Sequence, residues 1–529
     1  MNSSAFIACD EGVIRGTRAG TSGCPRSARP WVLAATIVGS SMAFIDTSVV
    51  NVALPAIQGD LSAAVREAQW VVNAYMLMLG ALLLVGGAAG DRFGRRRVFI
   101  IGITIFAAAS VACAWAPDAT ALIAARAVQG IGGALLVPGS LAIISAMFPE
   151  AERGRAIGTW AGASALTTAL GPVLGGWLVD TWSWRVIFLI NVPIAAVAVA
   201  LAIWRMPESR DESSDVAVDW LGGALAVVAL GALAYGLTLA SENGWMRAPV
   251  LGSLAVAIVT LGSFLWREAR ARTPMMPLEL FRSKDFSGAN LITLLLYFAL
   301  GGVMFFVPFN LIRIQGYSAA MAGAAFLPFS LIMGVLSRWS GGLIEQYGAR
   351  KLLTVGPTIV AVGFALLAVP GIGGPYWTTF FPAMVVIGFG MAVSVAPLTT
   401  SVMRAVDDRH AGVASGINNA TARVAGMLAV AVLGMIAVAA FGRAVDARVD
   451  RISMSNETRA LVRAEVPKLA EAQPPGSIDG EQRDAVKRAF NESFVYSFRI
   501  VALIAAALAL ASAVCGWLTI EPSKRRLRT

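Results

Sequence analysis

Charged residues are scarce in this sequence. Asp, Glu, Lys and Arg together make up 14% of its 529 residues, whereas soluble globular proteins contain about 25%. Hydrophobic residues make up 57%, and the mean hydropathy is +0.70. Because the apolar residues lie in runs of about 20, long enough to cross a bilayer as a helix, the sequence predicts an all-α polytopic membrane protein.

The residues that most enzymes use for chemistry are also few. His410 is the only histidine, and the four cysteines (Cys9, Cys24, Cys113 and Cys515) have neither metal-ligand spacing nor the pattern of a disulfide framework. No Gly-Lys dipeptide occurs, which excludes a Walker A loop, and no GxSxG nucleophile elbow is evident. We therefore expect no enzyme activity, no metal site and no cofactor.

Fourteen apolar segments are predicted to be membrane-spanning helices, in a pattern of six, two and six. This pattern is typical of a duplicated six-helix bundle with an inserted helical pair. The first six segments lie near 31–56, 68–90, 97–116, 120–147, 154–179 and 185–205. The inserted pair lies near 219–240 and 249–267. The last six lie near 286–312, 319–344, 351–370, 376–403, 411–441 and 494–519.

These segments divide the chain into five parts, one of which contains a polar outer loop at 442–492. The charges of that loop are mixed and balanced, so we expect a solvated loop without a role in transport, part of which can form an amphipathic helix. The parts are a cytoplasmic tail (1–30), an N-terminal six-helix bundle (31–205), linkers with the inserted helices (206–285), a C-terminal six-helix bundle (286–520) and a basic cytoplasmic tail (521–529).

The basic residues predict the orientation. The net charge is +10, and in membrane proteins Lys and Arg collect in cytoplasmic loops. With a cytoplasmic N-terminus, most basic residues fall on the cytoplasmic side, and the short outer loops hold only Arg66, Arg185 and Arg247. The first 30 residues lack the apolar core of a signal peptide. We therefore expect a multi-pass protein of the cell inner (cytoplasmic) membrane with both termini in the cytoplasm, and no nucleic-acid partner.

A charged hinge, GAAGDRFGRRR, joins the second and third helices at Gly87–Arg97. A weaker copy, GGLIEQYGARK, occurs in register in the second half of the chain. Two such hinges indicate a duplicated membrane bundle, which is typical of a transporter. Because the copy replaces two arginines by Gln346 and Ala349, we expect the first hinge to contribute more. The equivalent pairs are Gly87 and Gly341, Asp91 and Glu345, Gly94 and Gly348, Arg96 and Arg350, and Arg97 and Lys351.

Two ionisable residues lie deep in apolar helices, where charges are costly and often mark a transport pathway. At 1.5 Å per residue, Asp46 lies roughly 14 Å, and Arg126 roughly 12 Å, below the outer surface, so they can pair. Low-dielectric surroundings raise the pKa of a carboxyl group, and a nearby arginine lowers it. A carboxyl group under both influences can load and release a proton, or attract a cationic substrate, as its surroundings change. The alternative is an ion pair with a purely structural role.

Three further polar residues lie on the thirteenth segment. Arg423 is at mid-membrane depth, about one turn after Asn418 and Asn419. It faces either the substrate cavity and Asp46 or the packed interface between the two bundles. Depth alone does not show which of these faces it occupies.

The fifth segment contains Gly171, Pro172, Gly175 and Gly176, which allow close helix approach and a bend, although glycine-rich packing is common in membrane helices.

Together these segments resemble the major facilitator superfamily, and more narrowly its fourteen-helix drug:proton antiporters of the EmrB/QacA type, over about residues 31–520. Four motifs carry the resemblance. Ala89 departs from the leucine that the family prefers. The hinge motif GxLxDRxGRR is matched at Gly87, Asp91, Arg92, Gly94, Arg95 and Arg96. LxxxRxxQGxGxA is matched at Leu122, Arg126, Gln129, Gly130, Gly132 and Ala134. GPxLGG is matched at Gly171, Pro172, Leu174, Gly175 and Gly176. DxxxxNxALP is matched at Asp46, Asn51, Ala53, Leu54 and Pro55.

The resemblance implies a role for each motif. Arg126 would couple protons with Asp46 as its partner, the fifth-helix motif would favour exchange over symport, and Asp91 would latch the bundles in the outward-facing state. The function implied is proton-driven export of small hydrophobic compounds, often cationic. We expect the protein to be monomeric, and whether it needs a periplasmic adaptor in a double-membrane bacterium is left open by the sequence. The alternatives are a dedicated exporter of one metabolite, antibiotic, siderophore or lipid, and a non-transporting membrane sensor.

Overall fold

The computed structural model describes residues 27–209, 219–271, 274, 276–406, 411–476, 478 and 480–521, and these are mostly helical. Among them, thirteen helical segments are long and apolar enough to cross a membrane. A further helix of 32 residues, α6 (Glu150–Thr181), lies where another span was predicted. The prediction of an all-α polytopic fold with about fourteen spans is confirmed.

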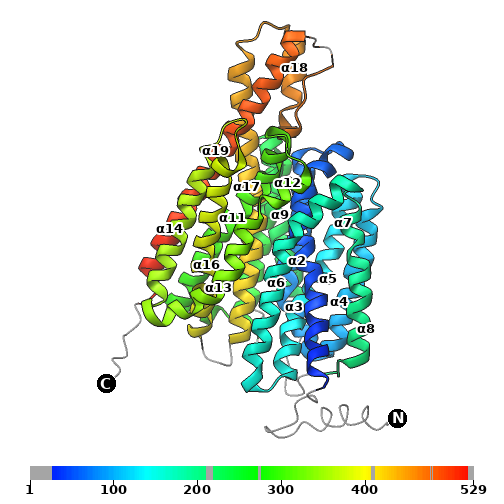
Figure 1. The fold of residues 1–529 in the computed structure, drawn as a ribbon, viewed down its shortest axis with the longest axis vertical. Coiled ribbons are helices and arrows are strands. Elements are labelled where there is room, and N and C mark those ends of the chain that lie inside the picture. The colour runs from blue at the N-terminus through cyan, green and yellow to red at the C-terminus, as the bar shows by residue number, and fades with distance from the viewer. Residues whose placement is uncertain are drawn as a thin grey trace.

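The first half of the chain forms one group of packed helices (Figure 1). α3 and α4 both pack against α5, and α2 lies between α6 and α8. Close approach is possible because Gly86, Gly102 and Gly130 face the backbone of neighbouring helices, where a side chain would not fit. The helices are α2 (Arg29–Asp60), α3 (Val65–Phe93), α4 (Arg95–Ala114), α5 (Ala119–Met147), α6, α7 (Val186–Leu189) and α8 (Asn191–Arg205).

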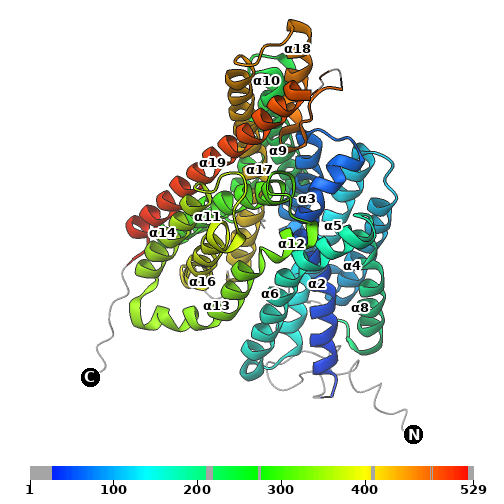
Figure 2. The same cartoon turned by 45° about the horizontal axis from the view of Figure 1, so that its top comes forward.

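The second half forms a corresponding group. α14 packs between α16 and α19, and α11 packs between α17 and α19 (Figure 2). The helices are α11 (Lys284–Phe309), which continues into η3 (Asn310–Ile314), α12 (Ala319–Ala324), α13 (Leu327–Tyr347), α14 (Ala349–Leu367), α15 (Tyr376–Thr379), α16 (Phe381–Arg404), α17 (Ala411–Val449) and α19 (Gly480–Thr519). A short segment, η2 (Leu278–Arg282), precedes α11.

The two inserted helices, α9 (Trp220–Asn243) and α10 (Ala248–Arg270), pack against each other, and α9 also packs against α3 and α17. α10 presents exposed apolar residues such as Ile258 and Val259, which suits a surface in contact with lipid tails. Asp219, just before α9, binds Arg267, in the last turn of α10, at 2.8 Å. α9 therefore covers one side of the line along which the two halves meet.

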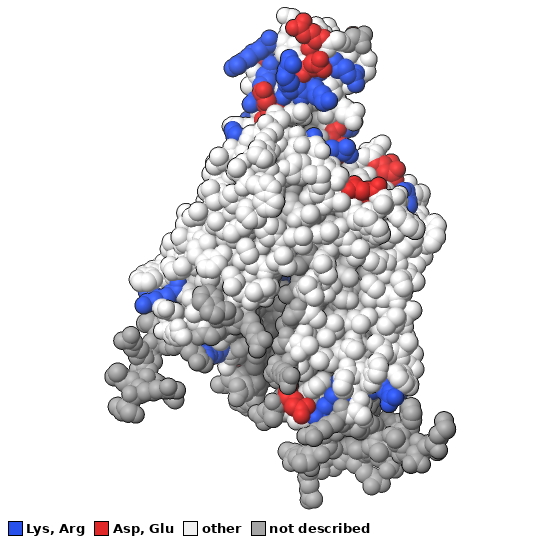
Figure 3. All heavy atoms as spheres, in the orientation of Figure 1, with Lys and Arg blue, Asp and Glu red and all other residues white. Residues whose placement is uncertain are grey.

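The predicted outer loop is helical and packed. α17 continues to Val449 and α19 begins at Gly480, and α18 (Asn456–Ala464) and η5 (Val466–Glu471) lie between them, so the helix limits expected near 441 and 494 were wrong. These helices continue because Phe441 packs against Phe490, with ring centroids 6.1 Å apart. We call residues 442–492 the extension. It projects from the bundle and carries charges of both signs (Figures 1 and 3).

The two ends of the bundle differ. We call the end near Arg29 and Thr519 the terminal side, and the end near Asp60 and Val65 the loop side. Hydrogen bonds join the halves on the loop side: the carboxylate of Asp180 accepts from the backbone N–H groups of Ala319 (3.0 Å) and Ala320 (2.7 Å). The space-filling view shows a hollow between the halves toward the terminal side (Figure 3). The structure is therefore closed on the loop side.

Candidate functional site

Asp46 and Arg126 form a buried ion pair, with 2.5 Å between Oδ2 of Asp46 and a terminal guanidinium nitrogen of Arg126. Both side chains are almost fully shielded, at 0% and 1% exposed. The amide of Gln129 donates to Oδ1 of Asp46 at 2.8 Å, and its oxygen accepts from Arg126 at 2.6 Å. The structure thus brings together three of the six candidates for proton coupling or substrate binding, which are Asp46, Arg126, Gln129, Asn418, Asn419 and Arg423.

The local helices position this triad. Arg126 and Gln129 are three residues apart on α5, so they share a face one helical turn apart. Nε of Arg126 donates to the carbonyl of Val71 at 3.1 Å, which fixes the guanidinium against α3. Its central carbon lies 4.3 Å from the ring centre of Tyr75, within range of a cation–π interaction.

Two polar residues that the sequence reasoning missed extend this network. The amide of Gln129 also donates to the hydroxyl of Ser110 at 2.8 Å, which accepts from the amide of Asn191 at 3.2 Å. All three are fully buried. Ser110 and Asn191 are uncharged, so a search for intramembrane charges passes over them, whereas a search for any polar residue within an apolar segment would have found both. The triad is therefore connected through α4 to α8.

The first hinge is held locally. Asp91 binds Arg95, one turn further on, at 2.8 Å, and has no other hydrogen bond or ion pair with the described residues. Gly94 adopts a φ of +105°, which favours glycine and turns the chain from α3 into α4. A carboxylate that the sequence did not indicate, Glu208, accepts from the backbone N–H groups of Arg96 (3.0 Å) and Arg97 (3.2 Å). Glu208 thus stabilises the first turn of α4.

The hinge residues Gly87 and Arg92 also lie in the last turns of α3, where the guanidinium of Arg92 is 5.6 Å from the ring centre of Phe93.

The second hinge repeats the geometry of the first. Gly348 has a φ of +78° between α13 and α14, as expected for the equivalent of Gly94. The guanidinium of Arg350 lies 4.2 Å from the ring centre of Trp517. Glu345 falls within α13, and its side chain lies outside the described atoms.

The glycines of the fifth-span motif face other helices. A Cβ atom at Gly171 would overlap Ser48 of α2, and one at Gly175 would come within 2.8 Å of Val49. Gly176 faces the carbonyl of Ala319 in α12. Pro172 lies inside α6, and its carbonyl faces Gly323 of α12. The motif therefore brings α6 into direct contact with α2 in its own half and with α12 across the line between the halves.

The three candidates on α17 lie apart from the triad. The amide of Asn418 donates to Thr293 of α11 at 2.6 Å, so it joins two helices of the second half. Asn419 is exposed. Arg423 is half-buried beside Gly80 of α3, in the neighbourhood of Tyr75 and Tyr297. It forms neither a hydrogen bond nor an ion pair with the described residues, Asp46 included.

The comparisons with known proteins agree with this geometry. Residues 36–430 match the family "Major Facilitator Superfamily". The chain belongs to the major facilitator superfamily. It is therefore a multi-pass membrane transporter that moves small molecules, and the expectation that it is not an enzyme is confirmed.

Its relatives include resistance and export proteins. The chain is 34% identical over 498 residues to "Multidrug resistance protein Stp" of Mycobacterium tuberculosis (strain ATCC 25618 / H37Rv), covering 92% of this chain and 91% of that protein. It is 32% identical to "Tetracenomycin C resistance and export protein" of Streptomyces glaucescens (94% and 93% covered). It is 36% identical to "Methylenomycin A resistance protein" of Bacillus subtilis (strain 168) (76% and 86% covered).

Two solved structures share the fold. A bacterial homologue of the human lysosomal transporter Spinster, in an inward-facing and unoccupied conformation, matches with a TM-score of 0.64 at 17% identity, over 94% of this chain and all of that one. A D-xylose–proton symporter matches with a TM-score of 0.57 at 14% identity, over 93% and 98%. At these identities the likeness concerns the fold alone.

Proposed function

We propose that this protein is a proton-coupled antiporter that exports small hydrophobic compounds, including drugs, by alternating access. The observation that carries the proposal is the triad of Asp46, Arg126 and Gln129. Burying a carboxylate with almost no exposure to solvent is costly even when an arginine and an amide bind it. Ionisable residues that are kept within the membrane at this cost usually have a function. The resistance and export functions named for relatives covering most of the chain support the direction of transport.

The triad offers a route for exchange. With Asp46 ionised, Arg126 and Gln129 hold it and the pair is closed to solvent. Protonation of Asp46 removes its charge, weakens its contact with Arg126, and frees the helices to rearrange. A proton on Asp46 and a substrate between the halves would therefore favour different conformations, which is the condition for coupled exchange.

The proposal also covers orientation. The terminal side would face the cytoplasm, because basic residues collect in the tails and loops there. Closure on the loop side, through Asp180 and α12, then corresponds to an inward-facing state that receives substrate from the cytoplasm. Export of one dedicated product is the second candidate, favoured by the relative named for tetracenomycin C.

The test is transport by the whole protein. In proteoliposomes with an imposed pH gradient, a panel of hydrophobic compounds should move against the proton flow and stop when a protonophore is added. In cells, overexpression should lower the accumulation of the same compounds, whereas deletion should raise it. Movement of several unrelated compounds supports multidrug export, and movement of one supports a dedicated exporter. Transport that ignores the protonophore would refute proton coupling.

The hinge gives a first prediction. Asp91 binds Arg95 in this loop-side-closed state, so its role as a latch between the halves would belong to the opposite state. We expect Asp91→Ala to slow transport by roughly tenfold, because conformational steps often limit turnover, while substrate binding stays unchanged. Arg97→Ala is the control in the same hinge. Its side chain is 79% exposed, and its contact with Glu208 is long, at 3.8 Å, and therefore weak. Normal cycling with lost binding in Asp91→Ala would refute the latch.

A further inference from the structure

Arg423 is a cation within a membrane-spanning helix. It lies in α17, where the described residues provide no hydrogen bond and no ion pair to its guanidinium group. Ionised side chains within membrane spans are costly. They usually pair with one another or with backbone carbonyls, and they often line a transport pathway. The charge of Arg126, in contrast, is compensated by Asp46. Within the part of the chain that the structure describes, Arg423 is therefore a positive charge without a counter-charge.

Its surroundings place this charge beside the line between the halves. The Cβ atom of Arg423 lies so close to α3 that a Cβ added at Gly80 would be 3.1 Å away. α9 covers one side of this contact, where Leu77, Ala234 and Met427 form a buried apolar cluster. The guanidinium lies in the neighbourhood of Tyr75 of the first half and Tyr297 of the second. Arg423 therefore extends toward the space between the halves.

The charge of that space limits the substrate class. Asp46 is fully buried and already bound to Arg126, so in this state its carboxylate is not available to attract a cationic compound. The half-buried Arg423 instead offers several N–H donors to an anion. We propose that Arg423 binds an ionised acidic group, a carboxylate or a phenolate, on the exported hydrophobic compound. This inference rests on the proposed export function and replaces cationic substrates by acidic ones.

Two coumarin dyes that share one ring system test the inference: 7-diethylaminocoumarin-3-carboxylate, which is anionic, and its neutral ethyl ester. In proteoliposomes we expect the wild type to export the carboxylate. Arg423→Gln should slow this export by at least about tenfold, the scale of one lost hydrogen bond to a charged group, and Arg423→Lys should restore part of it. Export of the ester by Arg423→Gln should stay within about twofold of the wild-type rate, as expected for a residue that contacts only the acidic group.

Other results would overturn it. Equal losses for both dyes would assign Arg423 a structural role, and export of the ester but not the carboxylate by the wild type would exclude an anion site. If the wild type exports neither dye, nor any compound of the wider panel, under a pH gradient, the proposed export function itself fails. If it exports other compounds but neither dye, the acidic-substrate inference alone fails.

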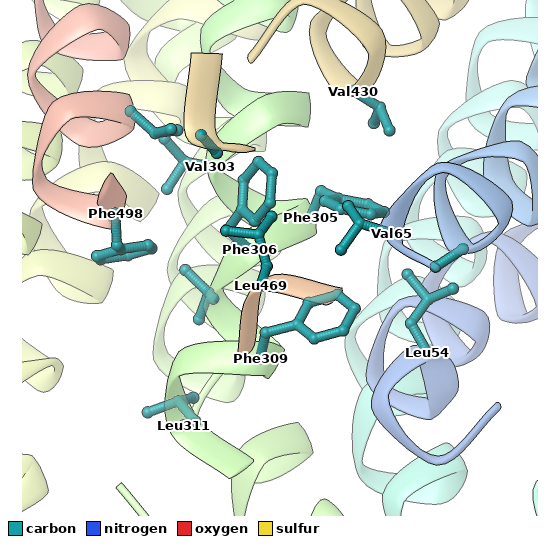
Figure 4. Close-up of a cluster of buried hydrophobic side chains, with 14 of the residues drawn as sticks. Leu54, Val65, Val303, Phe305, Phe306, Phe309, Leu311, Val430, Leu469 and Phe498 are labelled. Atoms are coloured by element: carbon teal, nitrogen blue, oxygen red, sulfur yellow. The ribbon is translucent and has the colours of Figure 1, made fainter. Parts of the chain in front are cut away.

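The extension supports a second inference. In η5, Leu469 is 3% exposed and lies beside Phe306 and Phe309 of α11 (Figure 4), and η5 packs against α2 and α3 of the first half and against α17 and α19 of the second. Its φ of +52° is uncommon for a leucine, which indicates that the surrounding contacts hold it there. The amide of Gln58 donates to the carbonyl of Lys468 at 3.3 Å, and Glu471 binds Arg313. We infer that η5 is a lid that closes the loop-side exit and must lift during transport.

Cross-linking tests the lid. In a variant whose four natural cysteines are replaced by alanine, Gln58→Cys and Lys468→Cys would be joined by a short reducible reagent. We expect transport to fall to the level of empty vesicles and to return on reduction. The control is a cross-link between Asp446→Cys and Arg463→Cys. The natural side chains at these positions form an ion pair at 2.7 Å within the extension, so this cross-link should leave transport unchanged. Full transport by the first cross-linked protein would refute the lid, and equal inhibition by the control would show that only general rigidity matters.

Discussion

Replacing Asp46 by asparagine is expected to reduce proton-driven efflux to the level of vesicles without protein. Asparagine has nearly the same shape as aspartate, but it cannot gain or lose a proton at this site. It also leaves Arg126 buried without its counter-charge. We therefore expect the substrate gradient that a pH gradient builds up in proteoliposomes to vanish, while any passive exchange of substrate remains.

A control on the same helix separates coupling from damage. Asp60, at the loop-side end of α2, binds Arg185 at 2.7 Å, and both side chains are partly exposed. Such exposed pairs contribute only about 0–1 kcal/mol, so Asp60→Asn should transport at nearly the wild-type rate. Loss of one partner of a buried pair costs about 3–5 kcal/mol, so the melting temperature of Asp46→Asn must be measured beside its activity. Wild-type efflux by a folded Asp46→Asn protein would exclude its coupling role.

The triad shows what sequence alone can predict. Helix rise and charge scarcity place Asp46 and Arg126 at one depth, and the structure joins them in an ion pair. Gln129 became a candidate only through the family motif. Depth along a helix gives no information on its rotation, so the face occupied by Arg423 could not be predicted. The structure resolves this, because Arg423 lies against Gly80 of α3.

The extension shows where composition misleads. Its polar sequence was expected to be a solvated loop, because hydropathy measures average character and not the pairing of two helices. α17 and α19 support each other there through Phe441 and Phe490, 49 residues apart in the chain. Leu469 is buried because η5 packs against helices of both halves, and such packing has no local signal in the sequence. The contact of Glu208 with the first hinge is likewise a long-range feature.

A single methyl group at Gly323 is expected to slow transport by more than about tenfold. A Cβ atom there would overlap the carbonyl oxygen of Pro172, so Gly323→Ala cannot keep the present contact between α12 and α6. The atoms that this Cβ would meet belong to the backbone of Pro172 and Val173, which cannot move aside as a flexible side chain would. Because this contact closes the loop side, the variant should favour states in which α6 and α12 are separated, and a shift of only 1.4 kcal/mol changes the ratio of states by about tenfold.

Gly262→Ala is the matched control for this change. Gly262 lies in α10, where an added Cβ atom meets nothing within 4 Å, so this variant gains the same helix propensity without the clash. Accessibility gives a second measurement: a cysteine at Ala320, in the otherwise cysteine-free protein, should react faster with an impermeant maleimide from the loop side when Gly323→Ala is present. Equal labelling and equal transport in both variants would mean that α6 and α12 need not meet for the cycle to run. Faster labelling with slow transport would show that the Gly323–Pro172 contact contributes to closure on the loop side.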